Sequence, residues 1–169
     1  NRLCAALVLL ASDDPSADSY LWINSPGGSV TSMLAIRDTI RTIPAPVRTV
    51  NLGLAASAGQ FVLSAGTPGH RYSLPHSKVL LHQGSAGIGG SAGDIAIQAD
   101  DLRQTRDTVL GLIAADTGQD IATVERDSRR DRWFTAEDAL AYGFVDHVVT
   151  SLDDIPPRPR AAVGLAVAS

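Results

Sequence analysis

The chain has 169 residues, of which 44% are hydrophobic and 19% are charged, and its formal net charge is −4. This length and composition predict one globular domain with a single substantial core. The negative net charge argues against a nucleic-acid-binding protein, and the single cysteine, Cys4, excludes an internal disulfide.

An apolar run over residues 3–10 is too short to span a bilayer and stops at the polar sequence 12–15. We therefore expect a core helix here, with Cys4 buried in it, and no membrane segment. The chain begins with Asn1 inside a helical pattern, so we expect an N-terminal segment to precede it in the full protein.

A strand, a tight turn and a helix follow one another twice in the first half of the chain. The sequence predicts a strand over 20–24, a turn over 25–28 and a helix over 30–43 that prolines stop. A strand over 47–52 and a helix opening at Ser57 repeat the pattern. This repetition predicts β-α crossovers and a largely parallel sheet.

The second half continues with short strands over 71–73 and 78–82, after which glycines interrupt the pattern. Apolar residues at helical spacing then predict a long amphipathic helix ended by Gly118, namely Ile95, Ala99, Leu102, Val109, Leu110 and Ile113. Capping-box spacing over 135–138 predicts a last short helix, and a strand is expected over 144–149. We expect one domain over 1–151 and an irregular Pro/Arg/Ala tail over 152–169.

Three residues stand out for their chemistry. Ser57 supplies a hydroxyl nucleophile, His82 a base that can take its proton near neutral pH, and Asp131 a carboxylate that can orient the base. Taken singly, they are more typical of a helix cap, a polar strand end and a surface charge. The surroundings of Ser57 favour a catalytic role instead. The small residues around it and the helix after it place free N–H groups where an oxyanion would form.

The order Ser, His, Asp along the chain also discriminates among hydrolases. An α/β-hydrolase would have the sequence Gly-x-Ser-x-Gly with the acid before the histidine, whereas here Ala55 stands two residues before Ser57 and Asp131 comes last. The residues therefore predict a serine hydrolase of another class.

Several ordered motifs together resemble the proteolytic-subunit family of the Clp protease. They are Asn24-Ser-Pro-Gly-Gly28, Ala55-Ala-Ser57-Ala-Gly59, Leu74-Pro-His, His82-Gln, Asp116-Thr-Gly-Gln119, Arg126-Asp with Arg130-Asp131, and Tyr142-Gly-Phe-Val-Asp146. The resemblance covers nearly the whole chain up to about Val149.

The resemblance implies an α/β protein with the ClpP/crotonase-like fold of repeated β-β-α units and a protruding handle made of a strand and a long helix. It implies a cytoplasmic serine endopeptidase without cofactor or metal. Two heptameric rings would stack to enclose a chamber fed by an AAA+ unfoldase of the Clp type. Ser57 would be the nucleophile, His82 the general base, Asp131 the orienting acid, and the N–H groups of Gly28 and Ala58 the oxyanion donors.

Other sites are implied in the same way. Substrate would bind along Gly27, Gln83, Gly84 and Ser85, pairing with an extended strand through main-chain hydrogen bonds. The family typically has proline where this chain has Gly84, so the strand is expected to be looser before substrate binds.

Unfoldase docking is expected at the aromatic residues Tyr20, Trp22 and Tyr72. Thr42 stands where many members have a further aromatic residue.

Arg129 and Arg130 are expected at the ring interface. Family members commonly carry an acid at the position of Arg129, which pairs with the arginine corresponding to Arg130. A like-charge contact would replace that ion pair, so the stacking of two identical rings is in doubt.

Three alternatives stay open. The chain could be a weakly active or structural ring subunit that depends on a paralogue. It could be a crotonase-type acyl-CoA enzyme on the same fold, with acidic residues as acid and base. It could also be a Ser-Lys peptidase that uses Lys78, the only lysine, on the same strand face as His82.

Overall fold

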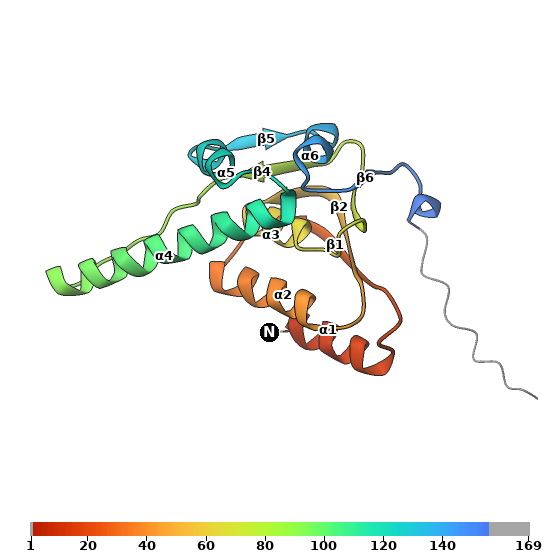
Figure 1. Ribbon diagram of the computed structural model, residues 1–169, viewed down its shortest axis with the longest axis horizontal. Coiled ribbons are helices and arrows are strands. Elements are labelled where there is room, and N and C mark those ends of the chain that lie inside the picture. Colours follow the sequence, from red (N-terminus) through yellow and green to blue (C-terminus); the bar gives the residue numbers. More distant parts are fainter. Residues whose placement is uncertain (1, 156–169) are drawn as a thin grey trace, which may run out of the picture.

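The computed structural model describes residues 2–155 as a mixed α/β fold (Figure 1). In chain order its elements are α1 (Arg2–Asp13), β1 (Ser19–Ser25), α2 (Val30–Thr42), β2 (Val47–Ala56), α3 (Ala58–Ser64), β3 (Arg71–Ser73), β4 (Lys78–Leu81), α4 (Ala92–Thr117), α5 (Ile121–Ser128), β5 (Arg132–Phe134), α6 (Ala136–Tyr142), β6 (His147–Val148) and a 3-10 helix (Leu152–Asp154).

The six strands form one sheet in the order β5-β4-β2-β3-β6, and β1 also pairs with β2. All pairs are parallel except β4 with β5. The largely parallel sheet predicted from the repeated strand, turn and helix is therefore confirmed. The long strand β2 contacts β3 through its first half and β4 through its second half, so it joins both parts of the sheet.

Helix α3 lies at the centre of the fold, in contact with β1, β2, β4, α2 and α4. All seven of its residues are buried, and Phe61 and Leu63 are among the largest side chains that are fully buried. Burial of this much apolar surface fixes the helix firmly against the sheet. The residue at its N-terminus, Ser57, is therefore held on a rigid support.

A buried ion pair ties β3 to the chain just before β6. The guanidinium of Arg71 donates to both carboxylate oxygens of Asp146, at 2.9 and 2.5 Å, and also to the main-chain oxygens of Asp116 and Gly143. Burial alone would raise the pKa of Asp146, but the hydrogen bonds and charge of Arg71 hold it below its ordinary value. Asp146 thus stays ionised, and Arg71 joins β3 to the segments at Asp116 and at Gly143 and Asp146.

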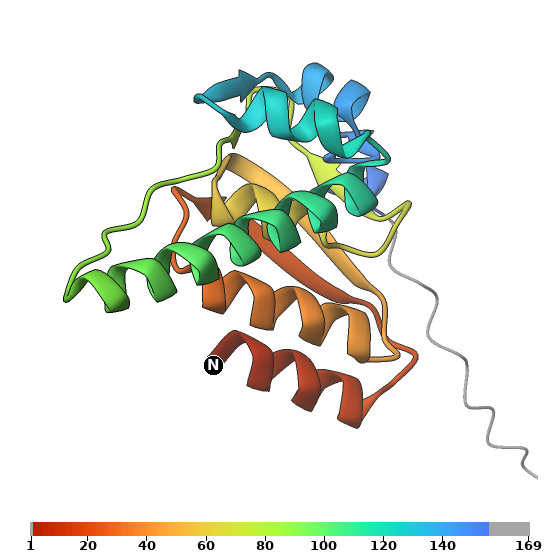
Figure 2. The same ribbon diagram turned by 60° about the vertical axis from the view of Figure 1, so that its left-hand side comes forward.

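Helix α4 projects well beyond the rest of the molecule (Figures 1 and 2). Gly118 ends it in the left-handed conformation, as predicted. Its buried residues, Leu110, Ile113 and Ala114, all lie in the last two turns. The expected apolar face is therefore buried only at the C-terminal end. Within residues 2–155 the projecting half contacts the segment before the helix, through Gln98 and Gly89, and Ile97 is 71% exposed there.

Several local expectations were wrong. In α1 only Leu7 and Ala11 are buried, Leu9 and Leu10 are exposed, and Cys4 is half-buried rather than part of the core. The predicted strand 144–149 shrinks to His147–Val148. Helix α5 and strand β5 were not predicted at all.

The predicted tail over 152–169 begins with ordered structure. Residues 152–154 form the 3-10 helix, and Ile155 is buried against Val50, Tyr72 and Val149. Residues 156–169 lie outside the described part of the chain. No helix within 2–155 combines the length and apolar character that crossing a membrane requires.

Candidate active site

Ser57 occupies the turn between β2 and α3 in a strained conformation. Its φ of 55° and ψ of −118° make it the one non-glycine residue of the described chain with a positive φ. Its side chain makes no capping hydrogen bond to the helix, although its position is that of the N-cap. The hydroxyl is therefore not used to stabilise α3, and the strain is of the kind found at functional sites.

Gly27 explains how the neighbouring turn can approach Ser57 so closely. A Cβ at Gly27 would lie 2.9 Å from the Cβ of Ser57, and the φ of Gly27 is +120°. Only glycine fits this combination of close contact and backbone conformation. Gly27 lines a smaller pocket of about 300 Å³ and not the pocket that Ser57 lines, although it was expected to bind substrate.

The two expected oxyanion donors lie beside Ser57. Ala58 is the first residue of α3, and both Ala58 and Gly28 line the same pocket as Ser57. Neither of their N–H groups has an acceptor within residues 2–155. Two amides are thus available to a ligand next to the Ser57 hydroxyl.

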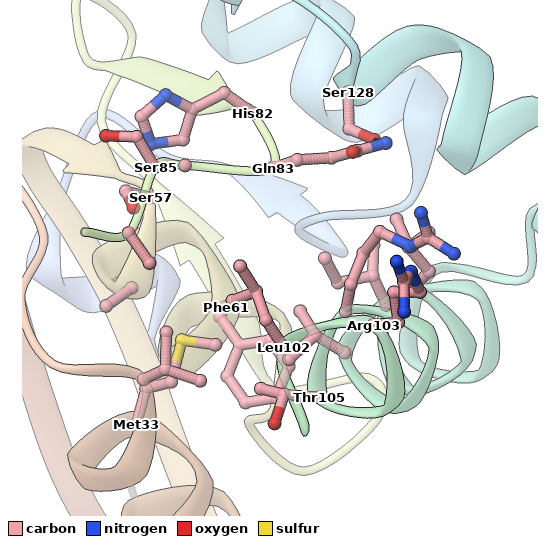
Figure 3. Close-up of a pocket in the computed structure, with 18 of the residues that line it drawn as sticks. Met33, Ser57, Phe61, His82, Gln83, Ser85, Leu102, Arg103, Thr105 and Ser128 are labelled. Atoms are coloured by element: carbon pink, nitrogen blue, oxygen red, sulfur yellow. Dashed lines mark hydrogen bonds between the residues drawn. The ribbon is translucent and has the colours of Figure 1, made fainter. Parts of the chain in front are cut away.

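His82 follows directly after β4, and its ring contacts Asp131. The distance between His82 Nδ1 and Asp131 Oδ1 is 3.0 Å, which is a hydrogen bond. Ser57 and His82 both line the main pocket, and Figure 3 shows the imidazole above Ser57 at one end of it. The structure thus brings together three residues that are distant in the sequence: Ser57 and His82 are 25 positions apart, and His82 and Asp131 are 49 positions apart.

No hydrogen bond joins Ser57 Oγ to His82 within residues 2–155. Proton transfer between them requires the two side chains to come within hydrogen-bonding distance, which in many enzymes happens when substrate binds.

The loop that carries Asp131 is anchored on both sides. Before it, the Oγ of Ser128 lies 3.2 Å from Gln83 Nε2, and the main-chain N–H of Gln83 donates to the Ser128 oxygen at 2.9 Å. After it, Arg132 Nη1 lies 2.5 Å from Asp127 Oδ2. These contacts tie the segment after His82 to the loop that holds its partner.

Asp127 is the nearest alternative acid, and its contacts are different. Its side chain is only 9% exposed and contacts Arg126, Arg132 and the hydroxyl of Tyr142. Burial together with the charge of Asp127 raises the pKa of Tyr142 to about 12, so the phenol stays neutral and can donate to the carboxylate. Asp127 therefore braces the loop but does not contact His82.

The main pocket has a volume of about 580 Å³ and lies between the segment after His82 and helix α4 (Figure 3). Three of the four residues expected to bind substrate line it: Gln83, Gly84 and Ser85. Gly84 has a φ of +74°, and no strand is formed over 83–90.

Sequence reasoning missed the rest of the pocket lining. Met33 and Phe61 supply an apolar wall, and Arg103 and Arg106 supply positive charge. Helical spacing in α4 was the available signal. Residues three or four positions apart are neighbours on a helix, so Arg106 lies between Leu102 and Val109 and next to Arg103.

Two of the three aromatic residues expected at a docking site lie on β1 and the third lies on β3, and β2 pairs with both strands. The rings of Tyr20 and Trp22 are stacked with centroids 6.2 Å apart, and Trp22 is 45% exposed. Tyr72 is buried on β3, where its hydroxyl accepts a hydrogen bond from Arg48. Of the three, only Tyr20 and Trp22 can therefore contribute to the surface of the chain.

Arg129 and Arg130 lie in the exposed turn that follows α5. Arg129 is 3.5 Å from Glu125 of its own helix, whereas Arg130 has no ion pair within residues 2–155. One of the two expected charges is thus partly compensated inside the subunit.

Lys78 is exposed at the start of β4 and does not line the pocket, so a Ser-Lys pair finds no support in this geometry.

Comparisons with known proteins agree with this fold and site. The family model described as Clp protease matches residues 1–152. Proteolytic subunit 2 of the ATP-dependent Clp protease from Corynebacterium efficiens is 57% identical over 150 residues, covering 89% of this chain and 75% of the relative. Proteolytic subunit 3 from Streptomyces coelicolor is 54% identical over 166 residues, covering 98% and 76%. Subunit 1 from Corynebacterium jeikeium is 56% identical over 151 residues, covering 89% and 80%. The chain therefore belongs to the Clp protease family.

Proposed function

We propose that this chain is a serine endopeptidase, the proteolytic subunit of a Clp-type chambered protease that cuts unfolded polypeptides into short peptides. One observation carries the proposal. A strained serine with an uncommitted hydroxyl shares a pocket with a histidine that is hydrogen-bonded to a carboxylate.

The proposed mechanism assigns each residue one task. Ser57 Oγ attacks the scissile carbonyl while Nε2 of His82 takes the hydroxyl proton and later gives it to the leaving amine. Asp131 holds the proton on Nδ1, so that Nε2 is free to accept. The N–H groups of Gly28 and Ala58 stabilise the oxyanion. A water molecule then releases the acyl group by the same steps.

Substrate would lie along Gln83, Gly84 and Ser85 and pair with their main chain. Because such hydrogen bonds do not involve side chains, this mode suits a peptidase that must accept many sequences. The ordering of a glycine-rich segment by substrate would cost conformational entropy, which lowers affinity for short peptides.

Assembly and partners belong to the same proposal. The names of the relatives describe proteolytic subunits of an ATP-dependent protease, which is consistent with ring assembly and association with a Clp ATPase. We place docking of an AAA+ unfoldase at the stacked pair Tyr20 and Trp22, of which Trp22 is exposed. We also propose that the chain assembles into heptameric rings, that two rings stack, and that the assembly is cytoplasmic.

The direct test is covalent labelling of the assembled protein with a serine-directed fluorophosphonate. We expect mass spectrometry to locate one adduct, on Ser57, because its uncommitted hydroxyl shares a pocket with the hydrogen-bonded pair His82 and Asp131 and has two available N–H groups beside it. Denatured protein should not react. An adduct on another serine of the assembled protein would contradict the assignment.

A second candidate function is that of a ring subunit that needs a paralogue for activity. The observation that favours it is the pair of adjacent arginines, Arg129 and Arg130, at the expected ring interface, of which only Arg129 has an acid within reach. The relatives carry the subunit numbers 1, 2 and 3, so a paralogue is a reasonable source of the missing acid.

Replacing Arg129 with glutamate should raise the fraction of double rings formed by this chain alone, and its peptidase activity with it. The change would let residue 129 pair with Arg130 of the opposite ring instead of repelling it. Sedimentation velocity at low and moderate salt measures the effect, and added salt should help the wild type because it screens the repulsion. A wild-type chain that is already a fully active double ring at low salt would refute this.

The crotonase-type alternative loses support. Such an enzyme would need acidic residues beside the oxyanion site, and no Asp or Glu of residues 2–155 lines the pocket.

A further inference from the structure

The pocket that holds Ser57 is positively charged at the end far from the serine. Its ionisable lining residues within 2–155 are His82, Arg103 and Arg106, and none of them is acidic. In Figure 3 Ser57 and His82 lie at one end, while Arg103 lies across the pocket on helix α4. The permanent charges among the lining residues are therefore the two guanidinium groups of Arg103 and Arg106.

The pocket is shaped for an extended chain. One wall is the segment 83–88 and the other is α4, whose residues from Ala99 to Ile113 line it. The two walls are joined at the outer end by Gln98, which exchanges two hydrogen bonds with the main chain of Gly89, at 2.8 and 3.2 Å. A polypeptide bound against 83–88 would thus run alongside α4.

The positions on α4 set the spacing between an apolar and a charged subsite. Phe61 follows Ser57 by one turn of α3, and Leu110 of α4 belongs to the same buried apolar cluster and lines the same pocket. Arg106 and Arg103 precede Leu110 by one and two helical turns, which places their Cα atoms about 6 and about 10 Å farther along the axis. An extended peptide covers these distances in about two or three residues.

The carboxylates that now neighbour the two arginines are weak competitors. Arg103 pairs with Asp100 and Arg106 with Asp107, both within α4, and all four side chains are between 44% and 78% exposed. Exposed pairs of this kind contribute little free energy, and a guanidinium has five N–H donors, so each can bind another carboxylate.

We propose that Arg103 and Arg106 select polypeptide segments that carry an acidic side chain two or three residues from the apolar residue seated near Ser57. The inference rests on the proposed peptidase function and adds a sequence preference to it. Main-chain pairing alone would leave the protease indifferent to the charge of its substrate. The two guanidinium groups make segments with glutamate or aspartate at this spacing the better substrates.

The test compares matched short peptides with one leucine in an alanine background and either glutamate or glutamine two or three residues before or after it. Binding is measured on the assembled Ser57→Ala protein, so that cleavage is not needed. At the favoured position the glutamate peptide should bind about fivefold more tightly, and added salt should reduce this ratio. Equal affinities at every position, or no binding of either peptide, would overturn the inference.

Two variants assign the preference to the arginines. In Arg103→Gln with Arg106→Gln the ratio should fall to about one while the glutamine peptide binds as before, which also shows that the pocket is intact. Arg2→Gln removes one positive charge on α1, away from the pocket, and should keep the ratio. A preference that survives the double substitution would overturn the assignment.

Cleavage by the unsubstituted chain separates the two claims. Tighter binding of the glutamate peptide without Ser57-dependent cleavage would refute the proposed function and leave this inference standing. Cleavage of both peptides at equal kcat/KM would do the opposite.

Discussion

Replacing Ser57 with alanine should lower the peptidase kcat by about 10⁶, the loss typical of serine peptidases that lose their nucleophile. The substitution removes one oxygen, and with it the atom that would form the acyl intermediate. Residual turnover would come from the oxyanion donors and substrate binding alone. A fluorogenic peptide assay on the purified assembled protein measures the effect.

The fold should survive this change, which makes the result interpretable. The Ser57 hydroxyl makes no hydrogen bond to α3, and alanine meets the same backbone strain as serine at a φ of 55°. We therefore expect an unchanged thermal midpoint. Ser12→Ala is a matched control, because this exposed serine bonds only to the main chain of its own helix. A Ser57→Ala protein that keeps more than about 1% of the activity would contradict the role of nucleophile.

The sequence was sufficient where local chemistry decides the structure. The capping box at Thr135 and Asp138 and the glycine after Thr117 start and end helices through contacts within one or two turns, and the structure contains both. Helix α5 was missed although Asp120 caps it, because Val124 and Ser128 are its only buried residues. Such a helix owes its stability to packing against α4, which sequence periodicity does not report.

The same limit applies to the site. Residue types and a family resemblance identified Ser57, His82 and Asp131 as a set, but their contacts depend on how β2, β4 and the turn after α5 meet in the sheet. Helical spacing groups the arginines of the pocket on one side of α4, but it does not show that this side faces a ligand. A projecting helix with little buried surface gives no pattern that shows which side faces a ligand.

Replacing Asp131 with asparagine should lower kcat by about 10⁴ and leave Ser57 and the fold in place. Asp131 accepts a hydrogen bond from Nδ1 of His82 across 3.0 Å, which keeps the proton on that nitrogen. An asparagine amide can donate to Nδ1 instead and so favour the tautomer with the proton on Nε2. That tautomer cannot take the proton of Ser57. Turnover per folded molecule is the measurement.

Asp127→Asn is the informative comparison, because this acid lies four residues earlier and braces the same loop without contacting His82. Its loss should weaken the contacts to Arg132 and Tyr142 and lower the free energy of unfolding by about 1–2 kcal/mol, with kcat changing far less than in Asp131→Asn. Chemical denaturation and peptide turnover, measured on both variants, separate stability from catalysis. If Asp131→Asn kept near-normal turnover while Asp127→Asn lost it, the orienting acid would be Asp127, and the hydrogen bond between His82 and Asp131 would have no part in proton transfer.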